Sequence, residues 1–106
     1  VNAVFCSNML HISPWPASAA LFKGSSKLLN SGENLIIYGP FTVNSEHTSQ
    51  SNLRFHIGLR EQNPCWGLRD INTLNLVAKT YGFVLIAELN MPSNNFLLVY
   101  KKSCTI

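Results

Sequence analysis

The stretch Glu33-Asn-Leu-Ile-Ile-Tyr-Gly-Pro-Phe41 determines much of the fold that we predict for this chain. Its apolar run Leu35–Tyr38 lacks the polar and apolar alternation of a half-exposed strand, which predicts a central parallel strand covered on both faces. Gly39-Pro40 ends this strand, because proline has no N–H to donate to a sheet. Polar residues follow at the carboxyl end, where open α/β sheets bind ligands. We therefore interpret the stretch as the middle strand of half of a ligand-binding α/β domain.

The residues before this stretch predict another strand and a connecting helix. Ala3–Cys6 are small, β-branched or aromatic, so we expect a strand over Asn2–Leu10. Two prolines hold the loop His11–Pro16, and the spacing of Ala17–Leu29 predicts a helix. Its expected inner face consists of Leu21, Phe22, Leu28 and Leu29, with Ser25 among them. Because strand–helix–strand crossovers are right-handed, the two strands should be parallel, with their carboxyl ends on one rim.

A polar loop and a second helix are predicted after the central strand. Thr42–Ser51 has no apolar pattern and is long enough for a functional or mobile segment. Ser49 or Ser51 could cap a helix that runs to about Glu61. One face of this helix would carry Leu53, Ile57 and Arg60. Asn63-Pro64 ends the helix, and a compact link follows.

The last third of the chain predicts a helix and an antiparallel hairpin. Asp70 is the expected N-cap of a helix over Ile71–Tyr81, which has clean helical spacing. Phe83–Leu89 and Phe96–Lys101 favour strands, and the short turn between them makes them antiparallel. The predicted fold class is α/β: two parallel strands with a crossover helix, joined to a terminal antiparallel hairpin.

Composition limits the class of protein. A chain of 106 residues with 46% hydrophobic residues forms one small domain with a core. The eight Lys and Arg residues are scattered, so we expect no nucleic-acid partner. Three cysteines without CxxC spacing favour reduced thiols over disulfides or zinc. Because no membrane-length apolar run or signal-like segment is visible, we expect no membrane association and a cytoplasmic or nuclear location.

No catalytic motif is evident from residue spacing alone. His11, His47 and His56 have no spacing of shared metal ligands, and acidic residues are too few to suggest a carboxylate pair. A GxGxxG loop is absent from the sequence. The chain also begins directly at a predicted central strand, from which we expect a domain that lacks its first part. Residue patterns therefore predict an α/β fragment with a ligand-binding rim.

Five segments add a family resemblance. They are Asn8-Met-Leu-His-Ile-Ser-Pro-Trp15, Tyr38-Gly-Pro-Phe41, Ser51-Asn-Leu-Arg-Phe55, Asn63-Pro-Cys-Trp-Gly-Leu-Arg-Asp70 and Met91-Pro-Ser-Asn-Asn95. In these segments the chain resembles the methyltransferase-like 26 family, uncharacterised proteins similar to class I S-adenosylmethionine-dependent methyltransferases. The resemblance implies that residues 1–106 form the carboxyl-terminal half of a Rossmann-like methyltransferase sheet without the cofactor-binding half. Pro16 and His56 stand where many members have acidic residues.

The resemblance also implies candidate site residues on the rim. His11 would act on a proton or orient substrate, and Asn8 and Met9 would face the cofactor. The implied substrate-binding residues are Ser13, Tyr38, Asn94 and Asn95. Structural roles remain open, because a histidine or asparagine can equally cap a helix, tie a loop or form a turn. No metal is implied.

Two hypotheses about function follow. The first is a methyltransferase-like protein that acts on an unknown small-molecule or protein substrate. This chain would be a truncated form of that protein, and alone it would bind S-adenosylmethionine weakly or not at all. The second is a non-catalytic interaction module that associates, with itself or a partner, through its exposed first strand.

Overall fold

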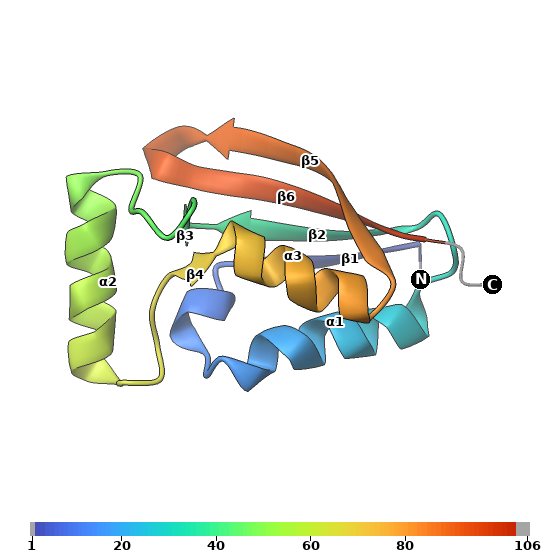
Figure 1. Ribbon diagram of the computed structural model, residues 1–106, viewed down its shortest axis with the longest axis horizontal. Coiled ribbons are helices and arrows are strands. Elements are labelled where there is room, and N and C mark those ends of the chain that lie inside the picture. The colour runs from blue at the N-terminus through green and yellow to red at the C-terminus, as the bar shows by residue number, and fades with distance from the viewer. Residues whose placement is uncertain (1, 104–106) are drawn as a thin grey trace.

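The structure is a computed structural model that describes residues 2–103. Two helices lie on one side of a four-stranded sheet, and a third lies beyond one end of it (Figure 1). The main elements are β1 (Ala3–Ser7), α1 (Pro16–Leu28), β2 (Asn34–Gly39), β3 (Phe41–Thr42), α2 (Gln50–Gln62), β4 (Arg69–Asp70), α3 (Ile71–Thr80), β5 (Phe83–Met91) and β6 (Asn95–Lys102). Short 3-10 turns occupy Leu10–Ile12 and Pro92–Asn94.

The sheet has the strand order β1-β2-β6-β5. β1 and β2 are parallel, whereas β6 is antiparallel to both β2 and β5. The predicted parallel pair and antiparallel hairpin are therefore confirmed. The sequence did not predict the position of β6, which lies between β2 and β5. The last strand of the chain is therefore the neighbour of the central strand β2.

The core lies between the sheet and the helices α1 and α3. Its buried residues include Phe22 of α1, Leu35 and Ile37 of β2, Leu74 and Ala78 of α3, and Leu98 and Tyr100 of β6. The Phe22 ring meets the Tyr100 ring edge-on, with centroids 5.1 Å apart and an interplanar angle of 87°. The Phe83 ring also packs on Phe22, with 5.8 Å between the ring centroids. Each buried aromatic or Leu side chain contributes about 1.5–3 kcal/mol.

The expectation that the central strand is covered on both faces is wrong for this chain. Along β2 the side chains alternate between buried and half-buried, because the helices α1 and α3 cover only one face of the sheet (Figure 1). The opposite face is apolar and partly or fully exposed, and we call it the open face. It comprises Phe5, Ile36, Tyr38, Val84, Ile86, Leu97 and Val99.

Two predicted segment boundaries are also wrong. β1 ends at Ser7 instead of Leu10, because Asn8 has a left-handed backbone with φ 53° and a 3-10 turn follows. The predicted loop Thr42–Ser51 shares its first residue with β3, which pairs in parallel with β4. The pairing partners are almost thirty residues apart in sequence, so local patterns carry no sign of this small second sheet.

The predicted helix caps are confirmed, but the predicted inner faces are confirmed only in part. The Ser49 and Asp70 side chains accept hydrogen bonds from backbone N–H groups of α2 and α3. On α1, Leu28 is exposed although its neighbour Leu29 is buried. On α2, the buried residues are Asn52 and Leu59, whereas Leu53 and Ile57 are exposed. α2 lies at the end of the sheet and does not pack on its face (Figure 1).

Two further properties concern the described residues alone. No helix within residues 2–103 has the length and apolar character needed to cross a membrane. Cys6 is buried, Cys65 is exposed, and both are free thiols. The third cysteine, Cys104, lies outside the described residues.

Candidate functional site

The carboxyl ends of β1 and β2 meet and form the predicted rim. The Asn8 N–H donates a hydrogen bond of 2.8 Å to the carbonyl of Tyr38. A Cβ added at Gly39 would lie 3.6 Å from Asn8 Oδ1 and 3.9 Å from His11 Nδ1. The structure therefore brings Asn8 and His11 together, directly over the last residue of the central strand.

His11 is the titratable side chain at the centre of this rim. It is only 8% exposed, and its ring meets the Phe55 ring of α2 at 5.4 Å between centroids. Its carbonyl accepts a hydrogen bond of 3.0 Å from the N–H of Gly67. Burial, and then the charge of Arg69, lower the pKa of His11 below its ordinary value. The imidazole is therefore neutral near pH 7 and can accept a proton.

Arg69 holds the loop that carries His11. Its guanidinium donates to the carbonyls of Ser13 at 2.6 Å and Cys65 at 2.8 Å, and more weakly to that of Leu10 at 3.4 Å. It also lies 5.6 Å from the centre of the Trp15 ring, within the range of a cation–π contact. Arg69 was not among the predicted site residues, because its contacts with Leu10, Ser13 and Trp15 join segments more than fifty residues apart. In the sequence, Arg69 stands out only as a member of Asn63–Asp70, one of the segments that carry the family resemblance.

Tyr38 and the hairpin asparagines form a second group. Asn95 Nδ2 donates to the Tyr38 hydroxyl at 3.3 Å and to the carbonyl of Pro92 at 3.2 Å. Asn94 has a left-handed backbone with φ 59°, as expected of a turn former, and its carbonyl accepts a 3.2 Å hydrogen bond from Asn52 of α2. The structure thus joins Tyr38 to Asn95. Asn94 instead connects the hairpin to α2 through a buried asparagine that sequence analysis missed.

Ser13 and Met9 lie on the loop after β1. The Ser13 hydroxyl donates a 2.7 Å hydrogen bond to the Met9 carbonyl, which closes a turn of this loop. The Met9 side chain is 56% exposed at the surface. The rim therefore offers one neutral imidazole, one phenol, amides and an exposed thioether. These groups can orient a polar molecule and accept a proton, and within residues 2–103 no cluster of three or more potential metal ligands occurs.

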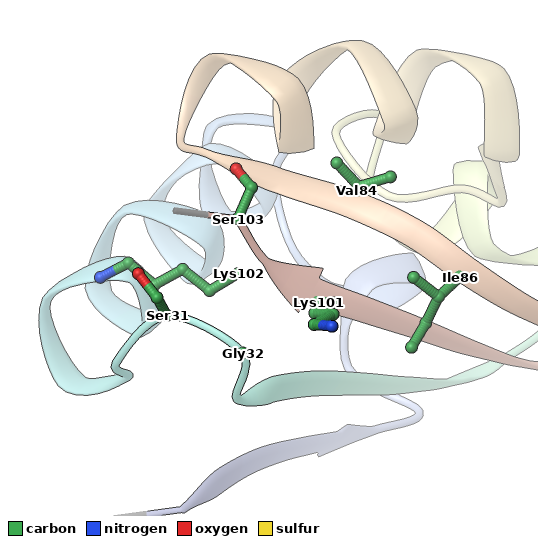
Figure 2. Close-up of a pocket in the computed structure, with 7 residues that line it drawn as sticks. All are labelled: Ser31, Gly32, Val84, Ile86, Lys101, Lys102 and Ser103. Atoms are coloured by element: carbon green, nitrogen blue, oxygen red, sulfur yellow. The ribbon is translucent and has the colours of Figure 1, made fainter. Parts of the chain in front are cut away.

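A cavity outside this rim lies at the other end of the sheet. It measures about 530 Å³ and lies where β2 begins, next to the end of β6. Figure 2 shows the lining residues Ser31, Gly32, Val84, Ile86, Lys101, Lys102 and Ser103. The Lys102 ammonium group already has hydrogen-bond acceptors, because it donates to the backbone carbonyls of Ser26 and Leu29 at the end of α1. Since Val84 and Ile86 belong to the open face, we regard the cavity as part of that face.

Solved methyltransferases share this fold. An O-methyltransferase family 2 protein from Planctomyces limnophilus, solved with apigenin, has a TM-score of 0.85 and 14% identity over 95% of this chain. Human N-acetylserotonin methyltransferase, solved with S-adenosylmethionine, has a TM-score of 0.84 and 9% identity over 97%. An O-methyltransferase family protein from Burkholderia thailandensis gives 0.80 and 15% over 99%. The chain spans 30%, 30% and 31% of these proteins. Its fold is that of the carboxyl-terminal portion of a methyltransferase.

A family can also be assigned. The family described as "Protein of unknown function (DUF938)" matches residues 1–102, so the chain belongs to this family. The predicted methyltransferase resemblance is thus confirmed at the level of the fold, whereas the narrower assignment to the methyltransferase-like 26 family stays a prediction.

Proposed function

We propose that this chain is the carboxyl-terminal half of a methyltransferase-like domain of the methyltransferase-like 26 type, which uses S-adenosylmethionine within a longer protein. The observation that carries the proposal is the superposition on an O-methyltransferase, which has a TM-score of 0.85 and covers 95% of this chain but 30% of that protein. The substrate in this proposal is a small molecule or a protein with a nucleophilic oxygen or nitrogen.

The open face supports the proposal. Its apolar side chains are solvent-accessible on one face of a sheet whose other face carries the hydrophobic core. Large contiguous apolar surfaces are rare on proteins that act alone and usually mark a contact surface. The remaining part of a methyltransferase domain would cover this face and remove its apolar area from water, at about 25 cal/mol per Å².

The rim residues fit a methyl-transfer site. The bound cofactor supplies an electrophilic methyl group on sulfur. The neutral imidazole of His11 would accept the proton that the substrate nucleophile loses, or would orient that nucleophile. Asn8 and Met9 would face the amino-acid end of the cofactor. The proposed substrate-side residues are Ser13, Tyr38, Asn94 and Asn95.

Calorimetry with S-adenosylmethionine tests the proposal. A longer protein that contains this chain and a glycine-rich cofactor loop should bind the cofactor in the micromolar range. Tritium transfer from labelled S-adenosylmethionine to pooled small molecules and proteins then identifies the acceptor. A longer protein of this kind that binds no cofactor would contradict the proposal.

A second candidate function is association through β1. This strand lies at the edge of the described sheet and pairs only with β2 within residues 2–103. Phe5 on it is 62% exposed, and neither a charge nor a proline on the strand blocks further pairing. A stable oligomer of this chain alone, detected by sedimentation, would favour this function, whereas a monomer at high concentration would exclude it.

We propose a reducing compartment, the cytoplasm or the nucleus, for this protein. The support comes from the thiols of Cys6 and Cys65, which are both free. Burial raises the pKa of the Cys6 thiol, which keeps it protonated and poorly reactive. Alkylation of intact cells followed by mass spectrometry would test whether these cysteines are reduced.

A further inference from the structure

His56 attaches α2 to the link that follows this helix. Its Nδ1 accepts a hydrogen bond of 3.0 Å from the N–H of Leu68, in the link between α2 and β4. The ring lies so close to Gly67 that a Cβ at that position would be 2.7 Å from His56 Cε1. The link therefore approaches the helix closely and uses a lone pair that only an unprotonated Nδ1 provides.

The ionisable groups that face His56 are basic. The His47 ring, from the loop before α2, lies 4.9 Å away between centroids, and its own Nδ1 is buried without a hydrogen-bond partner. Arg60 faces His56 from the next turn of α2, and Arg69 faces it from β4. Burial, followed by the charges of His47, Arg60 and Arg69, lowers the pKa of His56. The site is therefore adapted to a neutral imidazole.

We propose that His56 is a pH-sensitive latch: its protonation releases α2 from the Gly67–Leu68 link and uncovers the rim at His11. A protonated imidazole is a donor at both nitrogens, so its Nδ1–H would face the Leu68 N–H and the hydrogen bond would be lost. Phe55, the neighbour of His56 on α2, packs on the His11 ring and would move with the helix. The latch does not depend on methyl transfer, and it would operate equally if the proposed function were wrong.

The direction of the pH effect follows from the lowered pKa. The attached state of His56 binds its proton less readily than the released state, whose pKa is near the ordinary value of 6.5. Attachment is therefore complete above about pH 6.5 and weakens as the pH falls below it. Asn52 does not titrate, so its hydrogen bond to the Asn94 carbonyl keeps the first turn of α2 in place.

Nuclear magnetic resonance on the full chain tests the latch residue by residue. The Cε1 proton of His56 reports its titration, and hydrogen exchange reports the protection factor of the Leu68 amide. Between about pH 7.5 and pH 5, we expect this protection factor to fall as His56 titrates, with an upper limit of about thirtyfold at pH 5 set by a released-state pKa near 6.5. The Ile37 amide, in the centre of the sheet, should keep its protection over the same range.

The variant His56→Asn is the matched control. Asparagine Oδ1 can take the place of Nδ1 as acceptor and does not titrate, so Leu68 protection should become independent of pH. The variant His47→Asn removes a neighbouring charge and should raise the pKa of His56 while it leaves the release intact. Unchanged Leu68 protection through the titration of His56, or equal loss at Leu68 and Ile37, would overturn the proposal. The wild-type comparison of these two amides decides the matter even if a variant does not fold.

Discussion

Leu28 and Leu29 offer a stability test with identical chemistry at adjacent positions. Leu28 is the last residue of α1 and is 59% exposed, whereas Leu29 caps the helix and is 2% exposed within the core. Sequence spacing placed both leucines on the inner face of the helix. We predict that Leu29→Ala is strongly destabilising and that Leu28→Ala is nearly neutral.

The magnitudes follow from the exposed fractions. Removing a buried leucine side chain costs the lost transfer free energy and leaves a cavity, together about 2–5 kcal/mol. Leu28 has lost only about two fifths of its contact with water, and a surface site can relax, so its replacement should cost about 0–1 kcal/mol. Alanine is also at least as good a helix former as leucine, which lowers the cost at Leu28 further. The expected difference between the variants is therefore about 1–5 kcal/mol.

Urea unfolding followed by circular dichroism measures both free energies of unfolding. The wild type and both variants should be compared at two protein concentrations, so that any contribution from self-association is visible. Typical domains have a net stability of only about 5–15 kcal/mol, so Leu29→Ala should shift the midpoint clearly. Equal losses in the two variants, or a larger loss for Leu28→Ala, would refute the packing of α1 on the sheet described above.

Three further predictions concern function. The chain alone should bind S-adenosylmethionine weakly or not at all by calorimetry, and micromolar binding would contradict the assignment of the cofactor-binding half to a longer protein. In such a longer protein, His11→Ala should lower the turnover number by a factor of about 10²–10⁴ with little change in cofactor affinity. An unchanged turnover number would assign His11 a structural role. The isolated chain should associate or melt broadly, and Phe5→Lys should reduce association in sedimentation velocity while Leu76→Lys, equally exposed on α3, should not. A sharp, concentration-independent melt of a monomer would show that the chain is self-sufficient.

Part of the candidate site could be predicted from the sequence because a rule of topology places it. Parallel strands joined by a crossover end on one edge of the sheet, and this places Asn8 and His11 beside Gly39. The contacts that hold the site could not be predicted in this way. Arg69, in β4, donates a hydrogen bond to the loop that carries His11 although the two segments are distant in sequence. Phe55 packs on His11 from α2, a helix whose position no local pattern specifies.

Local sequence patterns were enough to predict the kinds of elements and many of their ends. The features that allowed this act over only a few residues, so the sequence alone reveals them. They are the apolar periodicity, the capping side chains of Ser49 and Asp70, and the end of the strand at Gly39-Pro40. Long-range packing, in contrast, places β6 between β2 and β5, pairs β3 with β4 and leaves one face of the sheet open. These outcomes depend on the total surface that segments distant in sequence bury against one another. The residue pattern of a single segment therefore cannot predict how much surface it will bury against the others.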